Sequence, residues 1–426
     1  MIGDYPYLRI PLVAAYQRMF SVIPSNNYEK TELLVCLPGY FFGFHDKCPW
    51  SYDNSRLLAH RFDIEKSDSQ LENDSIEVGY FENDEFDKYR VIGSTRAWNW
   101  QQGSSLQWVG RTGKIIYNDV EQGKCVAKIY DPDESLHETM PYHIMAVSNN
   151  GRYALSCSFS RLGKGMPGYG YSQQLVDNAN DLLPDNEGLS IVDLENHDIK
   201  RIISLKVIVQ IAPHNYMDGA YHFFTHCLFS PNNKRFIFFH RYLRKNGTLE
   251  TRMFSSDLEG WNIWHFAGEK FSHIAWFNDT NVLAYCQPPG REIGFYYLEE
   301  FTNKVTSVAN EYLTSDGHPQ VTTDGKYILV DTYPDRFRNQ HLLIYDIDNK
   351  HCELLLKYKI PFKYRLERRC DFHPRWNRDN TMICFDSAHK NVRSLCVMRN
   401  PLCTGSSLAL KTEGPSEPLN ITLTKY

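Results

Sequence analysis

The stretch RRCDFHPRWNRDNTMICFDSAHKNVRSLCVM, residues 368–398, holds the pattern that decides the fold. A short segment ending at Trp376 is followed by the polar turn NRDN and then by a second apolar segment at 382–385. Asn, Asp, Gly and Ser tolerate turn and left-handed backbone geometry, so this pattern predicts two antiparallel strands joined by a tight turn. His373 stands three residues before Trp376, at the entrance of the predicted unit.

The same strand–turn–strand unit recurs along the chain. Seven copies occur, at residues 48–63, 106–121, 145–162, 227–242, 274–286, 319–334 and 374–389. Further apolar stretches follow the copies, as in GLSIVDLENHD and IKRIISL. Four strands per unit, at a spacing of roughly 40–50 residues, are typical of a β-propeller. We therefore predict an all-β, seven-bladed β-propeller with four-stranded antiparallel blades. A pair of β-sandwiches would explain the alternation but not seven copies of one unit.

The repeat divides the chain into three segments. We expect an N-terminal extension at 1–27, the propeller at 28–399, and a C-terminal tail or outer strand at 400–426. The apolar segment KTELLVCLPG, residues 30–39, is expected to join the last blade and close the ring, because closure removes exposed strand edges. Helix is expected only in the N-terminal segment and near residues 202–217. The insertion PGYGY, residues 167–171, is interpreted as a lid over one mouth of the ring.

Composition limits the classes of partner. The 426 residues carry a net charge of -5 and no long basic run, so nucleic acid and anionic membranes are not expected partners. Eleven cysteines without a CxxC motif indicate reduced thiols and a cytoplasmic location. No signal peptide is expected, and no membrane span, since no stretch approaches about 18 uninterrupted apolar residues. The phosphate-loop motif is absent, so no nucleotide cofactor is expected. The sequence does not indicate an oligomeric state.

Four consecutive units carry a histidine three residues before the anchor of their first strand: His226, His273, His318 and His373. In a propeller blade, the loop that enters strand one and the loop that follows strand two lie at the same end of the ring, because strand two runs back. Charged and polar residues follow several second strands, as in FFHRY and VDTYPD. A packing role would suffice for one histidine. We interpret the shared position, together with these polar residues, as a functional mouth.

A ring of neutral imidazoles suits a divalent transition metal such as Mn or Zn. The four histidines are therefore candidate metal ligands, and Cys370 and Asp371, beside His373, are further candidates. Alternatively, the histidines and nearby arginines bind a carboxylate-bearing sugar without a metal.

The segments HCLFSP, DGHPQVTTDGKYILVDTYPD and CDFHPRWNRDNTMICFDSAH resemble the seven-bladed oligogalacturonate lyases and the TolB-type propellers. The expected architecture is similar to that of the propeller ulvan lyases. The resemblance covers roughly residues 44–398 as a repeat pattern. It implies an intracellular lyase that cleaves short uronate oligomers by β-elimination, with a metal held by propeller histidines and a glutamine. Gln320 is one candidate for that glutamine, and the family's catalytic base does not map onto a single residue.

β-Elimination needs a group that neutralises the uronate carboxylate, a base for the C5 proton and an acid for the leaving oxygen. Arg241 and Arg161 are candidates for the carboxylate, through a bidentate fork. His240, His222 and Tyr171 are candidates for the base or acid. The expected substrate is an acidic oligosaccharide, and its further contacts are expected from His45, Arg61, Tyr242, Tyr333 and Arg336.

Two other functions remain open at this point. A glycoside hydrolase would need two well-placed carboxylates, which Asp331, Asp371 and Asp386 could supply. A non-catalytic propeller would bind a glycan or a protein partner, and it would show exposed aromatic residues and few titratable ones at the mouth.

Overall fold

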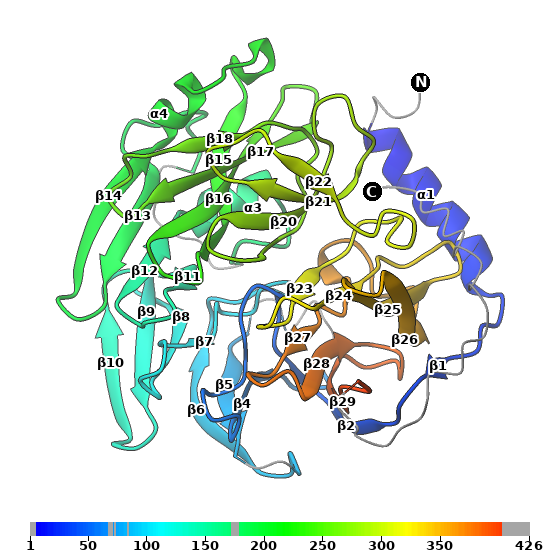
Figure 1. Ribbon diagram of the computed structural model, residues 1–426. Coiled ribbons are helices and arrows are strands. Elements are labelled where there is room, and N and C mark those ends of the chain that lie inside the picture. Colours follow the sequence, from blue (N-terminus) through cyan, green and yellow to red (C-terminus); the bar gives the residue numbers. More distant parts are fainter. Residues whose placement is uncertain (1–5, 67–70, 72–73, 83–84, 172–178, 403–426) are drawn as a thin grey trace.

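Seven antiparallel sheets stand around a common axis in the computed structural model (Figure 1). The structure describes residues 6–66, 71, 74–82, 85–171 and 179–402. Six sheets have four strands and one has five. The predicted seven-bladed propeller with four-stranded antiparallel blades is therefore confirmed.

The blades follow one another along the chain, and each begins with the strand nearest the axis. Blade 1 holds β3 (Tyr40–Phe41), β4 (Leu57–Arg61), β5 (Ile76–Phe81) and β6 (Tyr89–Thr95). Blade 2 holds β7 (Gln107–Trp108), β8 (Ile115–Glu121), β9 (Lys124–Asp131) and β10 (Leu136–Met140). Blade 3 holds β11 (Ala146–Val147), β12 (Tyr153–Ser156), β13 (Gly188–Asp193) and β14 (Asp198–Ser204). Blade 4 holds β15 (Tyr221–Phe229), β16 (Arg235–Leu243), β17 (Leu249–Asp257) and β18 (Trp264–Phe266).

Blade 5 holds β19 (Ile274–Trp276), β20 (Asn281–Cys286), β21 (Gly294–Glu299) and β22 (Val305–Ser307). Blade 6 holds β23 (Pro319–Val321), β24 (Tyr327–Asp331), β25 (Asn339–Asp346) and β26 (His351–Lys359). Blade 7 holds β27 (Arg375–Trp376), β28 (Met382–Ser387) and β29 (Ser394–Arg399). Its fourth strand comes from the other end of the chain.

The N-terminal segment closes the ring. Strand β2 (Leu33–Pro38) pairs with β29 as the outer strand of blade 7, and β1 (Tyr28–Glu29) pairs with β26 as a fifth strand of blade 6. The expectation that the segment 30–39 joins the last blade is thus confirmed. Most of the C-terminal segment expected at 400–426 lies outside the described residues, which end at 402.

Helices are few in the described chain. Helix α1 (Pro6–Ser21) precedes the ring, and α4 (Leu205–Gln210) with the 3-10 turn η1 (Asn215–Met217) fills the expected helical segment. Helix α3 (Phe159–Gly165) was not predicted; it begins at Ser158, whose side chain accepts a hydrogen bond from the Arg161 amide. A second 3-10 turn, η2 (Leu366–Arg368), follows blade 6. No described helix is long and apolar enough to cross a bilayer.

The central strands are buried on both faces, as the period of two in β16 predicts. Phe236 and Phe238 pack into the core shared with blade 3, whereas Ile237 and Phe239 pack into the core shared with blade 5. This double burial fixes the direction in which each following side chain of β16 points.

Blade 1 differs from the prediction. Its first strand is β3, not the segment at Trp50, which makes only an isolated bridge to Leu57. The residues between them form a loop whose backbone turns at Gly43, where φ is +119°. That loop carries residues 44 and 45 to the axis of the ring.

Candidate active site

Five histidines gather around the ring of Phe44. Its centroid lies 4.6–6.2 Å from the centroids of His45, His226, His273, His318 and His373. Adjacent members contact one another, since His318 lies 4.1 Å from His273 and 4.2 Å from His373. The structure therefore brings together the four histidines that share one repeat position, and it adds His45 from the loop of blade 1.

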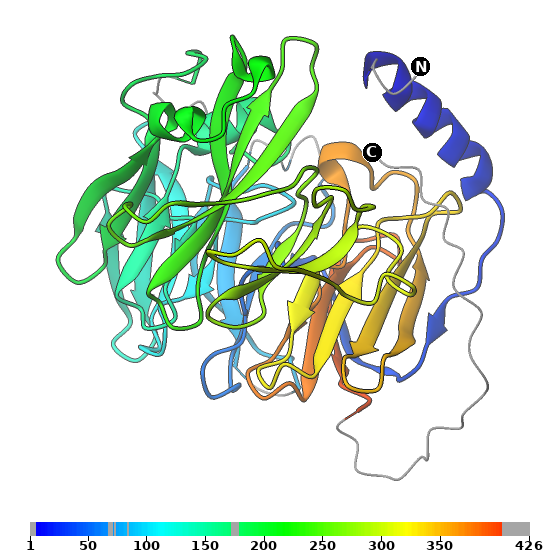
Figure 2. The ribbon, with the colours of Figure 1, turned by 45° about the horizontal axis from the view of Figure 1, so that its top comes forward.

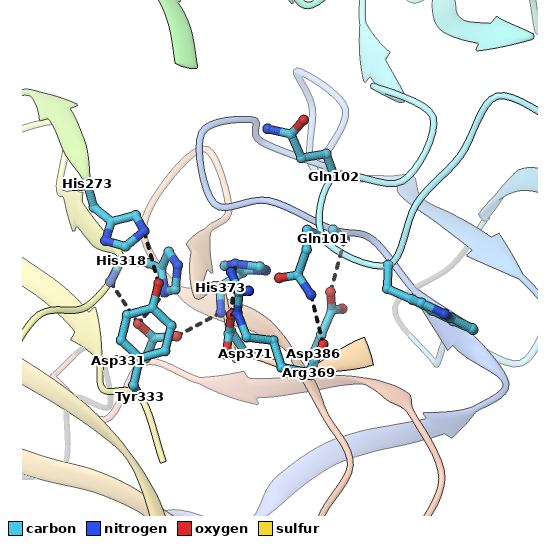
Figure 3. A network of polar contacts seen from close by, with 12 residues as sticks. Gln101, Gln102, His273, His318, Asp331, Tyr333, Arg369, Asp371, His373 and Asp386 are labelled. Atoms are coloured by element: carbon cyan, nitrogen blue, oxygen red, sulfur yellow. Dashed lines mark hydrogen bonds and ion pairs between the residues drawn. The ribbon is translucent and has the colours of Figure 1, made fainter. Parts of the chain in front are cut away.

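Two histidines of this cluster and a neighbouring carboxylate form a group suited to a divalent metal (Figure 3). His318, His373 and Asp371 each present a ligand atom, and these atoms lie within 4.8 Å of one another. Within the described chain, His318 Nε2, His373 Nε2 and Asp371 Oδ1 are buried without a hydrogen-bond partner. Buried polar atoms rarely lack a partner, so three together point to a missing ligand. His226 and His273 are not part of this group.

Asp331 orients the group from behind. Its Oδ1 accepts hydrogen bonds from the backbone amide and Nδ1 of His318, both at 2.8 Å, and its Oδ2 accepts from the His373 amide at 3.0 Å. Burial raises the pKa of Asp331 to about 7, against the effect of the two amides. Burial also holds the pKa of His318 well below its usual value. A neutral His318 that donates from Nδ1 keeps the Nε2 lone pair for a metal.

A second carboxylate fixes the loop that carries Phe44 and His45. Asp386 accepts hydrogen bonds from the amides of Phe42 and Gly43, both at 3.0 Å. Arg375 donates to the Gly43 carbonyl at 2.8 Å and to Asp386 at 3.3 Å. The loop is therefore held by a buried ion pair rather than by strand pairing.

The backbone is strained at two residues of the histidine cluster. His226 and His373 have φ values of 54° and 45°, a left-handed conformation that is uncommon for residues other than glycine. Such residues cost about 1–3 kcal/mol each and cluster at ligand sites.

A cavity of about 850 Å³ adjoins the cluster and reaches the surface. Arg241 lines it and is only 6% exposed. Its Nη1 contacts the Met166 sulfur at 2.5 Å, its Nε has no partner, and no described carboxylate pairs with it. Burial lowers the pKa of Arg241 to about 10, so the side chain is still cationic at neutral pH. A buried cation with no carboxylate in direct contact is a strong candidate for binding an anion.

His273 lies on the wall of this cavity between two partners. Its Nδ1 is 2.9 Å from Asp316 Oδ1, and its Nε2 is 3.4 Å from the hydroxyl of Tyr333. Burial raises the pKa of Asp316, but His273 and a hydrogen bond from Ser272 outweigh it and leave the pKa below its usual value. Burial raises the pKa of Tyr333 well above its usual value, so the phenol keeps its proton. The arrangement offers a proton acceptor and a proton donor side by side.

His240 and His222 lie on the opposite face of blade 4 from this cavity. His222 donates from Nε2 to the Met217 carbonyl at 3.1 Å, so its Nδ1 accepts from His240 Nε2 at 3.0 Å. Arg252 donates to His240 Nδ1 and to carbonyls of the α4 segment. These contacts attach α4 and η1 to the blade, and they do not bring either histidine to the mouth.

Four other predicted residues also lie away from the cavity. The Arg161 guanidinium donates to the carbonyls of Asp181, Leu182 and His222. Tyr171 stacks on Phe159 at 4.3 Å and accepts from Asn118. The remaining two are Arg61, which pairs with Glu77, and Tyr242, which packs on Met217.

Arg336 is exposed beside helix α1, where it stacks over Phe20. Gln320 donates to the His45 carbonyl at 2.6 Å, and Cys370 is buried in the core of blades 6 and 7. Of the five residues expected to bind substrate, only Tyr333 lines the cavity, and His45 belongs to the histidine cluster.

Two cavity residues, Arg369 and Asp316, were not predicted from the sequence, and a third, Tyr169, belongs to the insertion that was expected to cover the mouth. Arg369 donates to Asp371 Oδ2 and to the Tyr169 hydroxyl, both at 2.5 Å, and its side chain is 24% exposed. Asp316 lies in the same cavity beside His273. Each of the three lies in or next to a segment named in the sequence analysis. Tyr169 is part of PGYGY, Asp316 stands two residues before His318, and Arg369 stands two residues before Asp371.

No family model matches the chain, and no curated protein matches it. Solved structures do align with it. An oligogalacturonate lyase in complex with manganese has a TM-score of 0.61 at 12% identity, covering 88% of this chain and 96% of its own. The oligogalacturonate lyase of Vibrio parahaemolyticus has a TM-score of 0.58 at 11% identity, covering 89% and 98%. The resemblance inferred from the sequence is thus confirmed for the fold.

Proposed function

We propose that the chain is a carbon–oxygen lyase that cleaves a uronate-containing oligosaccharide by β-elimination in the mouth cavity. The observation that carries this proposal is Arg241, a buried cation without a carboxylate partner in the described chain, on the wall that also holds His273 and Tyr333. The fold likeness to two oligogalacturonate lyases supports it.

The residues of the cavity divide the steps of the reaction among them. The planar fork of Arg241 binds the uronate carboxylate, which makes the neighbouring C5 proton more acidic. His273 takes that proton at Nε2, while Asp316 holds its ring and stabilises the imidazolium that forms. The C5 electron pair forms the new double bond, the C4–O bond breaks, and the Tyr333 phenol gives its proton to the leaving oxygen.

A divalent cation such as Mn²⁺ or Zn²⁺ fits the group of His318, His373 and Asp371, because two neutral imidazoles and a carboxylate are ligands that both metals accept. These three side chains would hold such a cation, which would supply positive charge for the substrate carboxylate. Asp331 holds His318 in the tautomer that such a site needs.

The contacts of two of the three candidate carboxylates support elimination rather than hydrolysis. Asp331 and Asp386 accept hydrogen bonds from backbone amides that fix the central loops. Neither is placed as one of a pair of carboxylates flanking a sugar, which a glycosidase needs.

The test is incubation of the protein with uronate oligosaccharides, with and without added Mn²⁺, while the ultraviolet absorbance of the unsaturated product is followed. Metal content is measured in parallel. We expect the absorbance to rise, and His318→Ala to lower both the metal content and the rate. New reducing ends without an absorbance change would indicate hydrolysis instead. Binding without either product would indicate a non-catalytic glycan-binding propeller.

A further inference from the structure

A second hollow, of about 710 Å³, lies beside the mouth cavity between helix α1 and the segment 362–368. Figure 2 shows α1 alongside the ring at the edge of blade 6. Arg365 and Leu366 line both the hollow and the mouth cavity. The two spaces are therefore neighbours that share a wall, and we call the second one the α1 groove.

The α1 groove is strongly basic. Its lining includes four cationic side chains and one carboxylate, namely Arg18, Lys363, Arg365, Arg368 and Glu367. Arg18, Lys363 and Arg365 are exposed, and none of these three pairs with a carboxylate in the part of the chain that the structure describes. Lys363 and Arg365 instead lie over the rings of Tyr364 and Phe362, at 5.0 and 4.8 Å. Because these like charges are clustered, the electrostatic potential in the groove is positive, and an anionic ligand would relieve their repulsion.

The walls of the groove are anchored. Gln17 is 3% exposed and lies 3.5 Å from Arg338, a residue of the mouth cavity. Phe20 packs edge-on against Phe337 at 5.6 Å. These contacts hold the C-terminal half of α1 on blade 6, beside the mouth cavity.

The junction between the two spaces is strained. Leu366 has a φ of 53° and is 52% exposed. A left-handed backbone is unfavourable for a bulky side chain. Because the Leu366 side chain is exposed, hydrophobic burial does not offset this cost. Such outliers are typical of ligand clamps.

We propose that the α1 groove binds the distal, non-reacting units of an acidic oligosaccharide whose reacting unit occupies the mouth cavity. This inference rests on the proposed function and narrows its substrate to oligomers long enough to occupy both spaces. Each space alone has the size of a single small-ligand site, about 300–1,000 Å³, so together they hold more than one sugar unit. Binding energy from the groove is realised in the ground state as well as the transition state, so it lowers KM rather than raising kcat.

The test measures binding by titration calorimetry, which needs no turnover. The ligands are oligogalacturonates of two and of six units, and the protein is the full chain. We expect the hexamer to bind about tenfold more tightly than the dimer, a difference of about 1.4 kcal/mol. The double variant Arg18→Glu/Lys363→Glu should lose this difference and bind the dimer as the wild type does.

The matched control is Lys200→Glu/Arg201→Glu, the same charge change at two exposed residues of the outer strand β14. It should bind both ligands like the wild type. If the double variant unfolds, Arg18→Ala/Lys363→Ala replaces it, with circular dichroism as the check. Equal binding of dimer and hexamer by the wild type, or an unchanged hexamer affinity in the variant, would overturn the inference and leave the proposed function standing. Failure of the wild type to bind either oligomer would overturn both.

Discussion

Adjacent side chains on strand β16 point to opposite faces of the sheet and have different roles. On β16, Arg241 follows Phe239 onto the face of the mouth cavity, whereas His240 follows Phe238 onto the face of blade 3. The sequence HRY suggested that both groups reach the reacting sugar. Because side chains alternate across a sheet, only one of two adjacent residues on the strand faces the cavity.

The two residues should therefore respond differently to substitution. Arg241→Lys keeps the charge but loses the planar fork, so we expect kcat/KM on a uronate oligomer to fall at least about tenfold, with little change in the unfolding midpoint. His240→Ala removes the acceptor of the buried Arg252 Nε and the donor to His222 Nδ1, and it should destabilise the fold by about 1–3 kcal/mol. Steady-state kinetics and thermal unfolding of both variants check this. A stable His240→Ala protein with greatly reduced kcat would contradict the assignment.

His60 gives the protein a pH-dependent stability. Its Nε2 accepts from the Ser104 amide at 3.1 Å, and burial lowers its pKa to about 3. The unfolded chain has a histidine pKa of about 6.5, so below that pH the unfolded state binds the extra proton and the native state does not. The stabilisation is thus complete above about pH 6.5 and decreases by about 1.4 kcal/mol per pH unit below it.

His60→Gln keeps an acceptor for the Ser104 amide and removes this titration. Between about pH 7.5 and 5, we expect the variant to lose about 2 kcal/mol less unfolding free energy than the wild type. Denaturant titrations at the two pH values measure the difference.

At the scale of elements, the strand pair that closes the ring carries two adjacent thiols. Cys36 of β2 and Cys396 of β29 are directly opposite in the register, with their sulfurs 3.4 Å apart. The hydrogen bond from Cys396 lowers the pKa of Cys36 to about 6, despite burial, so a thiolate faces a thiol. Thiolates are the form that reacts with oxidants.

Diamide, an azo oxidant that accepts two hydrogens, should therefore link the two sulfurs in the folded protein. We expect a mass loss of two hydrogens, protection of both cysteines from maleimide, and a rise in unfolding free energy of about 2–4 kcal/mol. Intact-mass spectrometry and thermal unfolding measure these effects. In Cys36→Ser the mass loss at Cys396 should disappear; persistence of a Cys396 disulfide would point to a different partner.

Elements with strong local signals were predictable, and elements that depend on distant partners were not. The polar turns and apolar strands were read correctly because each turn needs Asn, Asp, Gly or Ser at fixed positions. Helix α3 was not predicted because its seven residues include two glycines, which disfavour a helix. Its packing against β15 decides its conformation. The position of the first strand of blade 1, at β3 instead of Trp50, was not predicted. The loop after β3 is held by Asp386, which is more than 340 positions away in the sequence.

At the scale of the whole molecule, the ring could be predicted from the repeat, but the cavity could not. The histidines share one repeat position, so their convergence follows from symmetry. Arg369 and Asp316 belong to loops between blades, and their place depends on how neighbouring blades are packed. Arg61 and Arg336 were expected to bind substrate, yet local partners, Glu77 and Phe20, hold them elsewhere.

Ring closure and helix α1 make separable contributions to the molecule. A chain that lacks residues 1–27 keeps β2 and should remain folded, with a small fall in the unfolding midpoint. A chain that lacks residues 1–38 exposes the apolar edge of β29 and should aggregate. Size-exclusion chromatography and thermal unfolding compare the two. A monomeric, cooperatively folded 39–426 chain would show that closure by β2 is dispensable.

The pairing of β2 with β29 also sets the order of events during synthesis. Strand β2 leaves the ribosome before its partner, which follows some 360 residues later. At about 5–20 residues per second, β2 waits on the order of twenty seconds to a minute before its partner is made. Blades 1 to 5 can form on the nascent chain in the meantime. The last blade is completed only after β29 has been made, and until then the apolar strand β2 is a natural target for chaperones.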